Sequence, residues 1–386
     1  MTTWRDDDAI AFGEKVISIL DTGRFTATYK YAVLLSLIDL CVESADENGL
    51  PPPSLSGREI GRRVFAMYWP QAVPFDGVPL RQSTTCGDIA ERILRFRLEH
   101  GVVAGTSLEE AQAAFPREMA SLECDVIETV IRMPLPKLQR FGSGVAVSED
   151  RFIYRIGWPD EVAASRVRRP DFDDRLWLEK RAGELLVRLS GLLRPLIRQQ
   201  WAAFVADRNR ERTDEAYLDE FLFGAARISL TPVRRSLARA QRGRCFYCRG
   251  QLRSRVEVDH FIPWSRHPDN GLDNLVAAHS GCNNAKRNAF AAVHPHLERW
   301  VGRFSPSAVE RRRLDVATRR LSWPRDPERT LGAARGLYLW LPQGTKLWAA
   351  DGRFVDHDPD VARAALTTPG RDRFMLAADQ PGDYDA

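Results

Sequence analysis

The 386-residue sequence predicts an α+β protein that is mostly helical, with a small metal-stabilised module after a large helical N-terminal region. Two observations support this class. Apolar residues recur at helical spacing through most of the chain before residue 232. Further on, two pairs of metal-type ligands, Cys245 with Cys248 and His279 with Cys282, enclose a stretch of strand-like alternation. The hydrophobic fraction of 44% is enough for cores to form without metal. The two ligand pairs therefore indicate a metal ion that cross-links the small module only.

Residues 1–115 are predicted to form a helical domain, because their apolar positions recur every three or four residues. A run containing three prolines, at residues 51–53, ends the second helix. The predicted helices span residues 9–22, 29–44, 58–68 and 87–100.

Residues 116–232 are predicted to be a mixed helical region with a hairpin. Phe152, Tyr154 and Ile156 alternate on one face after a turn at residues 148–150. Leucines at helical spacing predict a long helix or a pair of helices over residues 176–209, with a kink where Gly191 and Pro195 interrupt it. Two shorter helices are predicted at residues 217–223 and 233–241.

Residues 233–304 are predicted to hold the metal-stabilised module, and residues 305–386 a C-terminal helical and strand extension with a loose acidic tail. In the module, a strand around Val256 and Val258 ends at Asp259-His260, and a helix opens at Cys282. The remaining predictions are helices at 289–304 and 308–321 and an aromatic strand at 337–348 that turns at 343–344.

The basic residues are concentrated in the module. The whole chain has a formal net charge of only +4, but residues 233–300 contain twelve basic residues and five acidic ones. The rest of the chain is therefore slightly acidic. A solvated basic face would explain such a stretch alone, but beside metal-type ligands it favours attraction to phosphate.

The cysteines and the N-terminus indicate a cytoplasmic protein. Six cysteines are too few for a disulfide scaffold at this length, and we interpret Cys41, Cys86 and Cys124 as reduced thiols. The N-terminus is acidic where a secretory signal would be basic. The most apolar run, residues 31–42, is too short to span a bilayer and contains Asp39, so no membrane partner is expected.

Cys245, Cys248, His279 and Cys282 are predicted to hold a structural Zn²⁺ ion. Soft thiolates with one imidazole favour zinc, and four protein ligands leave no position open for a substrate. A single Cys-x-x-Cys pair would be weak evidence, because such pairs also occur in redox sites. Here a second pair with the same internal spacing follows within the length of a small zinc module.

A second group of polar residues lies between and beside these ligands. Asp259 and Asn283 offer hard oxygen atoms suited to Mg²⁺ or Mn²⁺, and the near-neutral pKa of a histidine suits His260 to act as a base. Asn274 can hydrogen-bond the loop that carries His260. Lys286 and Arg287 can meet a phosphate near the start of the helix.

These residues resemble the HNH nucleases, which have a ββα-metal fold, in a zinc-knuckle subtype. The motifs are CxxC, VDHFIPWS, DNLV and HxxCNxAK, and they cover about residues 242–288. The resemblance implies that His260 is the general base, that Asp259 and Asn283 hold the catalytic divalent ion, and that Asn274 is the supporting asparagine. The sequence departs from the pattern at Asn283, where the family name has histidine, and at His279, where such knuckles usually have cysteine.

We therefore expect a divalent-metal-dependent endonuclease that cuts double-stranded DNA, with Arg266, Lys286 and Arg287 contacting the backbone. Analogy with stand-alone bacterial nucleases suggests restriction or phage defence, with a homo-oligomer or a defence-system protein as further partner hypotheses. The alternative is a non-catalytic zinc-dependent nucleic-acid-binding or scaffold protein. In that alternative, a zinc-ribbon fold would use Asp259 and His260 only to cap a strand.

Overall fold

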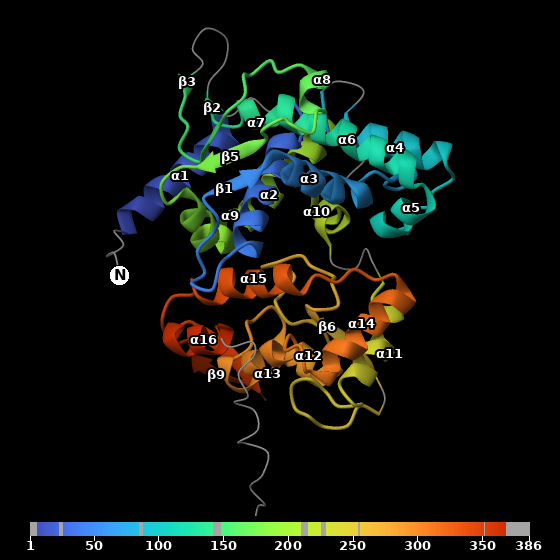
Figure 1. Ribbon diagram of the computed structural model, residues 1–386, viewed down its shortest axis with the longest axis vertical. Coiled ribbons are helices and arrows are strands. Elements are labelled where there is room, and N and C mark those ends of the chain that lie inside the picture. The colour runs from blue at the N-terminus through green and yellow to red at the C-terminus, as the bar shows by residue number, and fades with distance from the viewer. Residues whose placement is uncertain are drawn as a thin grey trace, which may run out of the picture.

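The computed structural model shows two packed bodies joined along the chain (Figure 1). The elements from α1 to α10 form the upper body, and those from α11 onward form the lower one. The structure describes residues 6–22, 26–84, 88–141, 148–209, 215–224, 229–253, 255–350 and 352–367. The predicted acidic tail and Cys86 lie outside these residues. The α+β class with mostly helical content is confirmed.

The upper body is built around α2, in which every residue from Lys30 to Glu43 is buried. Helix α9 packs along α2, and α3 packs against α6, so residues on both sides of position 115 share one core. The helices are α1 (Asp6–Thr22), α2 (Tyr29–Glu43), α3 (Gly57–Gln71), α4 (Ile89–Glu99), α5 (Leu108–Ala114), α6 (Pro116–Arg132), α7 (Pro134–Lys137), α8 (Ala164–Val167), α9 (Ala182–Arg208) and α10 (Glu215–Phe223).

The strands of this body pair differently from the predicted hairpin. The short strands β2 (Arg140–Phe141) and β3 (Ser148–Glu149) pair with each other, so residues 148–149 are strand and not turn. Strand β4 (Tyr154–Ile156) pairs instead with β5 (Arg175–Leu178), which also pairs with β1 (Ser54–Ser56) in the order β1-β5-β4. Pairing partners this distant in the chain leave no local signal. Helix α9 runs continuously through Gly191 and Pro195.

The lower body contains a strand hairpin, β6 (Val256–His260) and β7 (Leu275–His279), covered by helices. The sequence predicts a helix at residues 289–304, but the structure is helical only from residue 293 to 302. Most of the predicted aromatic strand at 337–348 is instead the end of a helix and a turn. The other elements are α11 (Thr231–Ala240), α12 (Ser280–Lys286), η2 (Val293–Leu297), α13 (Glu298–Gly302), α14 (Val309–Leu321), α15 (Pro327–Tyr338), β8 (Lys346–Ala350), β9 (Arg353–Asp356) and α16 (Pro359–Leu366).

None of the described helices is both long enough and apolar enough to cross a bilayer. Cys41 and Cys124 carry free thiols, as expected, with Cys41 buried and Cys124 exposed.

Helix α15 joins the two bodies by packing closely on α2 (Figure 1). Two glycines one helical turn apart, Gly332 and Gly336, allow this approach. A Cβ atom at Gly336 would lie 2.5 Å from the backbone oxygen of Val42, and one at Gly332 would overlap the backbone oxygen of Glu43. Since both obstacles are backbone atoms, no rotamer change can relieve the clash. The contact between the bodies therefore requires glycine at these positions.

Replacing Gly336 by alanine should push α15 away from α2 and lower the free energy of unfolding by about 1–3 kcal/mol, the range for overpacked cores. Gly13→Ala is the matched control, because its Cβ would meet Leu189 at an ordinary 3.8 Å inside a helix. That change should raise stability by about 0.5–1 kcal/mol. Chemical denaturation of both variants measures the difference, and equal stabilities would contradict the close approach.

Candidate functional site

The site is built on the hairpin of β6 and β7 and on helix α12, which follows β7 without a break. The register pairs Val256 with His279 and His260 with Leu275. Because strand side chains alternate, Glu257 and Asp259 share one face of β6, and α12 packs against that strand. This is the ββα arrangement that the motifs predicted.

Cys245, Cys248, His279 and Cys282 converge on one point. Their ligand atoms all lie within 4.8 Å of one another. A tetrahedral Zn²⁺ ion with bonds of about 2.3 Å to sulfur needs ligand atoms roughly 4 Å apart, so the group fits such an ion. The two cysteines before β6, the end of β7 and the first turn of α12 contribute the ligands.

The surroundings of the four ligands also fit a metal centre. The Nε2 atom of His279 lies 3.1 Å from the carbonyl oxygen of Gln251 and donates to it, which leaves Nδ1 to face the sulfurs. That Nδ1 lies 3.2 Å from the sulfur of Cys248. Burial and the sulfurs of Cys245 and Cys248 raise the pKa of the Cys282 thiol to about 12. A divalent cation would supply the positive charge that four crowded ligands need to ionise.

A cavity of about 300 Å³ opens beside the candidate zinc ligands. Asp259, His260 and Asn283 all line it, so three predicted site residues from β6 and α12 come together. The other lining residues are Val258, Pro263, Trp264, Asn284, Arg287 and Asn288.

His260 is held by a neighbour that the motifs did not predict. Its Nε2 atom donates to the Oδ1 atom of Asn270 at 2.7 Å, and its ring lies 5.2 Å from that of Trp264. Burial lowers the pKa of His260, although the hydrogen bond to Asn270 and the charge of Asp259 oppose this shift. With the proton on Nε2, the neutral imidazole keeps its lone pair on Nδ1. The neutral ring of His260 therefore has a proton-accepting nitrogen at Nδ1.

The Asp259 carboxylate is fixed through one of its two oxygens. The Tyr247 hydroxyl donates a short hydrogen bond to Oδ2, and the Lys286 ammonium lies 3.0 Å from the same atom. Oδ1 of Asp259 has no hydrogen-bond or ion-pair partner among the described residues, so it can bind another ligand. The Asn283 amide is also fixed through one of its two polar atoms. Its Nδ2 atom donates to the Glu257 carboxylate at 2.8 Å, and its Oδ1 atom takes no part in that hydrogen bond. One carboxylate oxygen and one amide oxygen at a shared cavity fit a hard divalent cation.

Lys286 does not lie on the surface, where a phosphate-binding residue is expected. Its side chain is fully buried, and its ammonium also donates to the carbonyl oxygen of His260 at 2.8 Å. A phosphate cannot reach it there, so its contacts assign it to positioning Asp259 and His260 instead. Arg287 is exposed and lines the cavity. Arg266 is half-buried and points toward Gly191 of α9, and it does not line the cavity.

Asn274 is completely buried and clamps the loop between the two strands. Its Oδ1 atom accepts from the backbone nitrogen of Ile262 at 2.8 Å. Its Nδ2 atom donates to the carbonyl oxygens of Ile262 and Asp269. These bonds close the loop that follows His260 and contains Asn270. His267 in this loop is also buried.

Tyr247, Asn270 and Glu257 are the site residues that the motifs did not reveal. Tyr247 lies between the two knuckle cysteines, a position that suggests a partner for the metal module but not which one. Asn270 lies ten residues from His260 and meets it only because the loop folds back. Nothing in the spacing of the sequence indicates that contact.

Residues 246–292 match a protein-family model described as HNH endonuclease. The chain therefore contains an HNH endonuclease domain, which confirms the resemblance seen in the motifs. The Cys₃His group at its edge agrees with the zinc-knuckle subtype. Comparison with curated proteins and with solved structures finds no match.

Replacing Cys248 by serine should release zinc and lower the melting temperature, since a structural zinc contributes on the order of 10 kcal/mol in small modules. His260→Ala should keep the zinc, because the histidine lies outside the ligand group. Cys124→Ser, at an exposed cysteine elsewhere, controls for the chemical change. Metal analysis and thermal unfolding give the readout. Retention of one zinc per chain by Cys248→Ser would refute the assignment.

Proposed function

We propose that this protein is a divalent-metal-dependent endonuclease that hydrolyses phosphodiester bonds of double-stranded DNA. One observation carries the proposal: Asp259, His260 and Asn283 line a single cavity inside the segment that matches the HNH endonuclease model. A base and two hard oxygen ligands at one cavity are the groups that hydrolysis of a phosphodiester requires.

In this proposal, His260 removes a proton from a water molecule while the water oxygen attacks phosphorus. A new bond forms between phosphorus and that oxygen, and the bond to one bridging ester oxygen breaks. The products are a phosphate monoester and a free hydroxyl group, whose proton comes from solvent. Asn270 supports the step by holding the proton on Nε2 of His260, so that Nδ1 receives the new one.

Asp259 and Asn283 would hold a Mg²⁺ or Mn²⁺ ion, which when bound stabilises negative charge on the departing oxygen. Lys286 and Tyr247 keep the Asp259 carboxylate in place by binding its other oxygen. Lys286 also balances the charge of the Asp259 carboxylate, whose side chain is only 9% exposed.

Other parts of the proposal concern the substrate and the biological setting. Arg287, exposed at the cavity, is placed to meet a backbone phosphate without reading a base. Arg266 is assigned a weaker contact, because it leans toward α9. A role in restriction or antiviral defence rests on analogy with stand-alone nucleases.

Plasmid cleavage tests the activity directly. Wild type should nick or linearise plasmid DNA with Mg²⁺ or Mn²⁺ and not with EDTA. His260→Ala should lower the rate at least about 100-fold, the usual effect of losing a general base. His294→Ala, at a histidine whose side chain is 81% exposed, should cut like wild type. If wild type binds DNA but never cuts it under any metal, the non-catalytic binding protein is the correct alternative.

Asn270→Ala should lower kcat by about 10-fold to 100-fold, because the His260 ring loses the partner that orients it. KM should change little, since Asn270 does not line the cavity. Asn270→Asp retains an oxygen acceptor and should recover much of the rate. Steady-state kinetics with a short duplex separates the two constants. An unchanged kcat in Asn270→Ala would remove Asn270 from the mechanism.

A further inference from the structure

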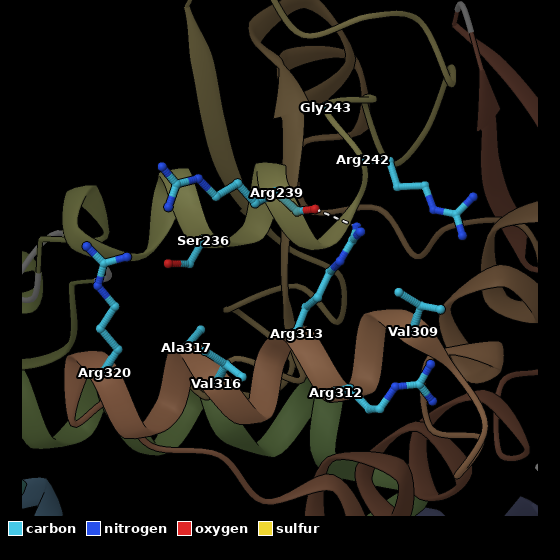
Figure 2. Close-up of a pocket in the computed structure, with 10 residues that line it drawn as sticks. All are labelled: Ser236, Arg239, Arg242, Gly243, Val309, Arg312, Arg313, Val316, Ala317 and Arg320. Carbon is cyan, nitrogen blue, oxygen red and sulfur yellow. Dashed lines mark hydrogen bonds between the residues drawn. The ribbon is translucent and has the colours of Figure 1, made fainter.

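A groove of about 700 Å³ lies between α11 and α14, apart from the cleavage cavity (Figure 2). The two helices pack side by side over an apolar cluster that includes Leu237 of α11 and Leu314 of α14. Leu275 of the hairpin belongs to the same cluster and Val256 packs against it, so these helices cover one face of the hairpin. The groove is lined by Ser236, Arg239, Arg242, Gly243, Val309, Arg312, Arg313, Val316, Ala317 and Arg320.

Five of the ten lining residues are arginines, and none of the ten is acidic. The two acidic residues of α14 are used elsewhere. Glu310 lies 3.0 Å from the buried guanidinium of Arg303, and Asp315 forms a short ion pair with the buried Arg325. Helix α11 contains no acidic residue. The exposed face of the helix pair therefore keeps a positive charge that no described carboxylate offsets.

The groove is preformed. Arg313 of α14 donates to the carbonyl oxygens of Arg239 at 2.9 Å and Ala240 at 3.3 Å, at the C-terminal end of α11. Figure 2 shows Arg313 reaching from one helix to the other, with Arg239 and Arg320 extending from opposite sides. The side chains of Arg239, Arg242 and Arg320 have no hydrogen-bond or ion-pair partner in the described part of the chain. These three guanidinium groups are available to an anion without breaking an existing contact.

The residue types that line the groove favour one class of binding partner over the others. Single-stranded nucleic acids are usually bound by aromatic side chains that stack on bases, and no aromatic residue lines this groove. A folded protein partner would need a larger apolar centre than Val309, Val316 and Ala317 supply. A double-stranded backbone needs only regularly spaced cations. The lining residues of α14 run from Val309 to Arg320, about 16 Å at roughly 1.5 Å per residue, which equals roughly five base pairs.

We propose that this arginine groove binds the phosphodiester backbone of double-stranded DNA outside the cleavage cavity and independently of base sequence. The proposal rests on the nuclease function proposed above and adds a surface that holds the substrate. Helix α11 ends at Ala240, and the knuckle begins at Cys245, so the groove adjoins the metal centre along the chain. None of its lining residues lines the cavity at His260.

The test compares two triple variants of the full chain in the His260→Ala background, in which bound DNA stays intact. The groove variant carries Arg239→Gln, Arg242→Gln and Arg320→Gln, and leaves in place Arg313, which joins the helices, and Arg312, which donates to the carbonyl oxygen of Ser307. The matched control carries Arg95→Gln, Arg117→Gln and Arg353→Gln, three exposed arginines outside the groove. Both variants lose the same charge. Their melting temperatures establish that the fold is kept.

Affinity for a short labelled duplex is measured between roughly 50 and 200 mM salt. The slope of log K against log salt should fall by about 0.9 for each groove arginine removed, while the control keeps the wild-type slope. Equal slopes in the two variants would overturn the proposal, as would polyglutamate competing as well as duplex DNA. Because cleavage plays no part in this readout, a protein that never cuts DNA could still bind through the groove, and the two proposals fail separately.

Discussion

Four ligand atoms within 4.8 Å of one another hold the candidate site together. They join the knuckle that follows α11, the end of β7 and the first turn of α12. Asn283 follows Cys282 directly, and Tyr247 lies between Cys245 and Cys248. The ligand group therefore adjoins both an amide at the cavity and the hydroxyl that donates to the Asp259 carboxylate. A Zn²⁺ ion bound by these ligands would add a cross-link to the apolar core of the module, in which Leu275 and Ala277 of β7 pack with Leu237 of α11.

The loop after His260 depends on both bodies of the chain. Trp264 donates to the carbonyl oxygen of Phe223 in the upper body, and Trp323 donates to that of Asn270. Behind the loop lies a buried ionic cluster, in which Glu43 pairs with Arg63 and with Arg329, the latter at 3.0 Å. Buried ion pairs contribute little net stability, but leaving one member unpaired is costly. We infer that this cluster fixes how the bodies dock, and with it the position of Asn270.

Burial divides the cationic residues into two groups with opposite tasks. Lys286, Arg303 and Arg325 are buried against carboxylates and backbone carbonyls, where they hold the module in shape. The nearby carboxylates of Asp259, Asp273 and Glu310 are paired with these buried cations. The arginines that line the groove between α11 and α14 then have no carboxylate partner among the residues that the structure describes. Basic residues of the lower body therefore support its interior in one place and form a candidate binding surface in another.

The sequence alone indicated the two candidate zinc-ligand pairs, the strand ending in Asp259-His260 and the helix around Cys282, because each pair or element is defined by residues a few positions apart. It also predicted the helices around α2, whose apolar spacing is local. Only the tertiary structure decided that β4 pairs with β5, that Asn270 orients His260 and that Lys286 is buried. These contacts join residues 10 to 26 positions apart, or different elements altogether. They exist because the chain folds back to satisfy buried polar groups, and no short-range pattern records which partner it will find.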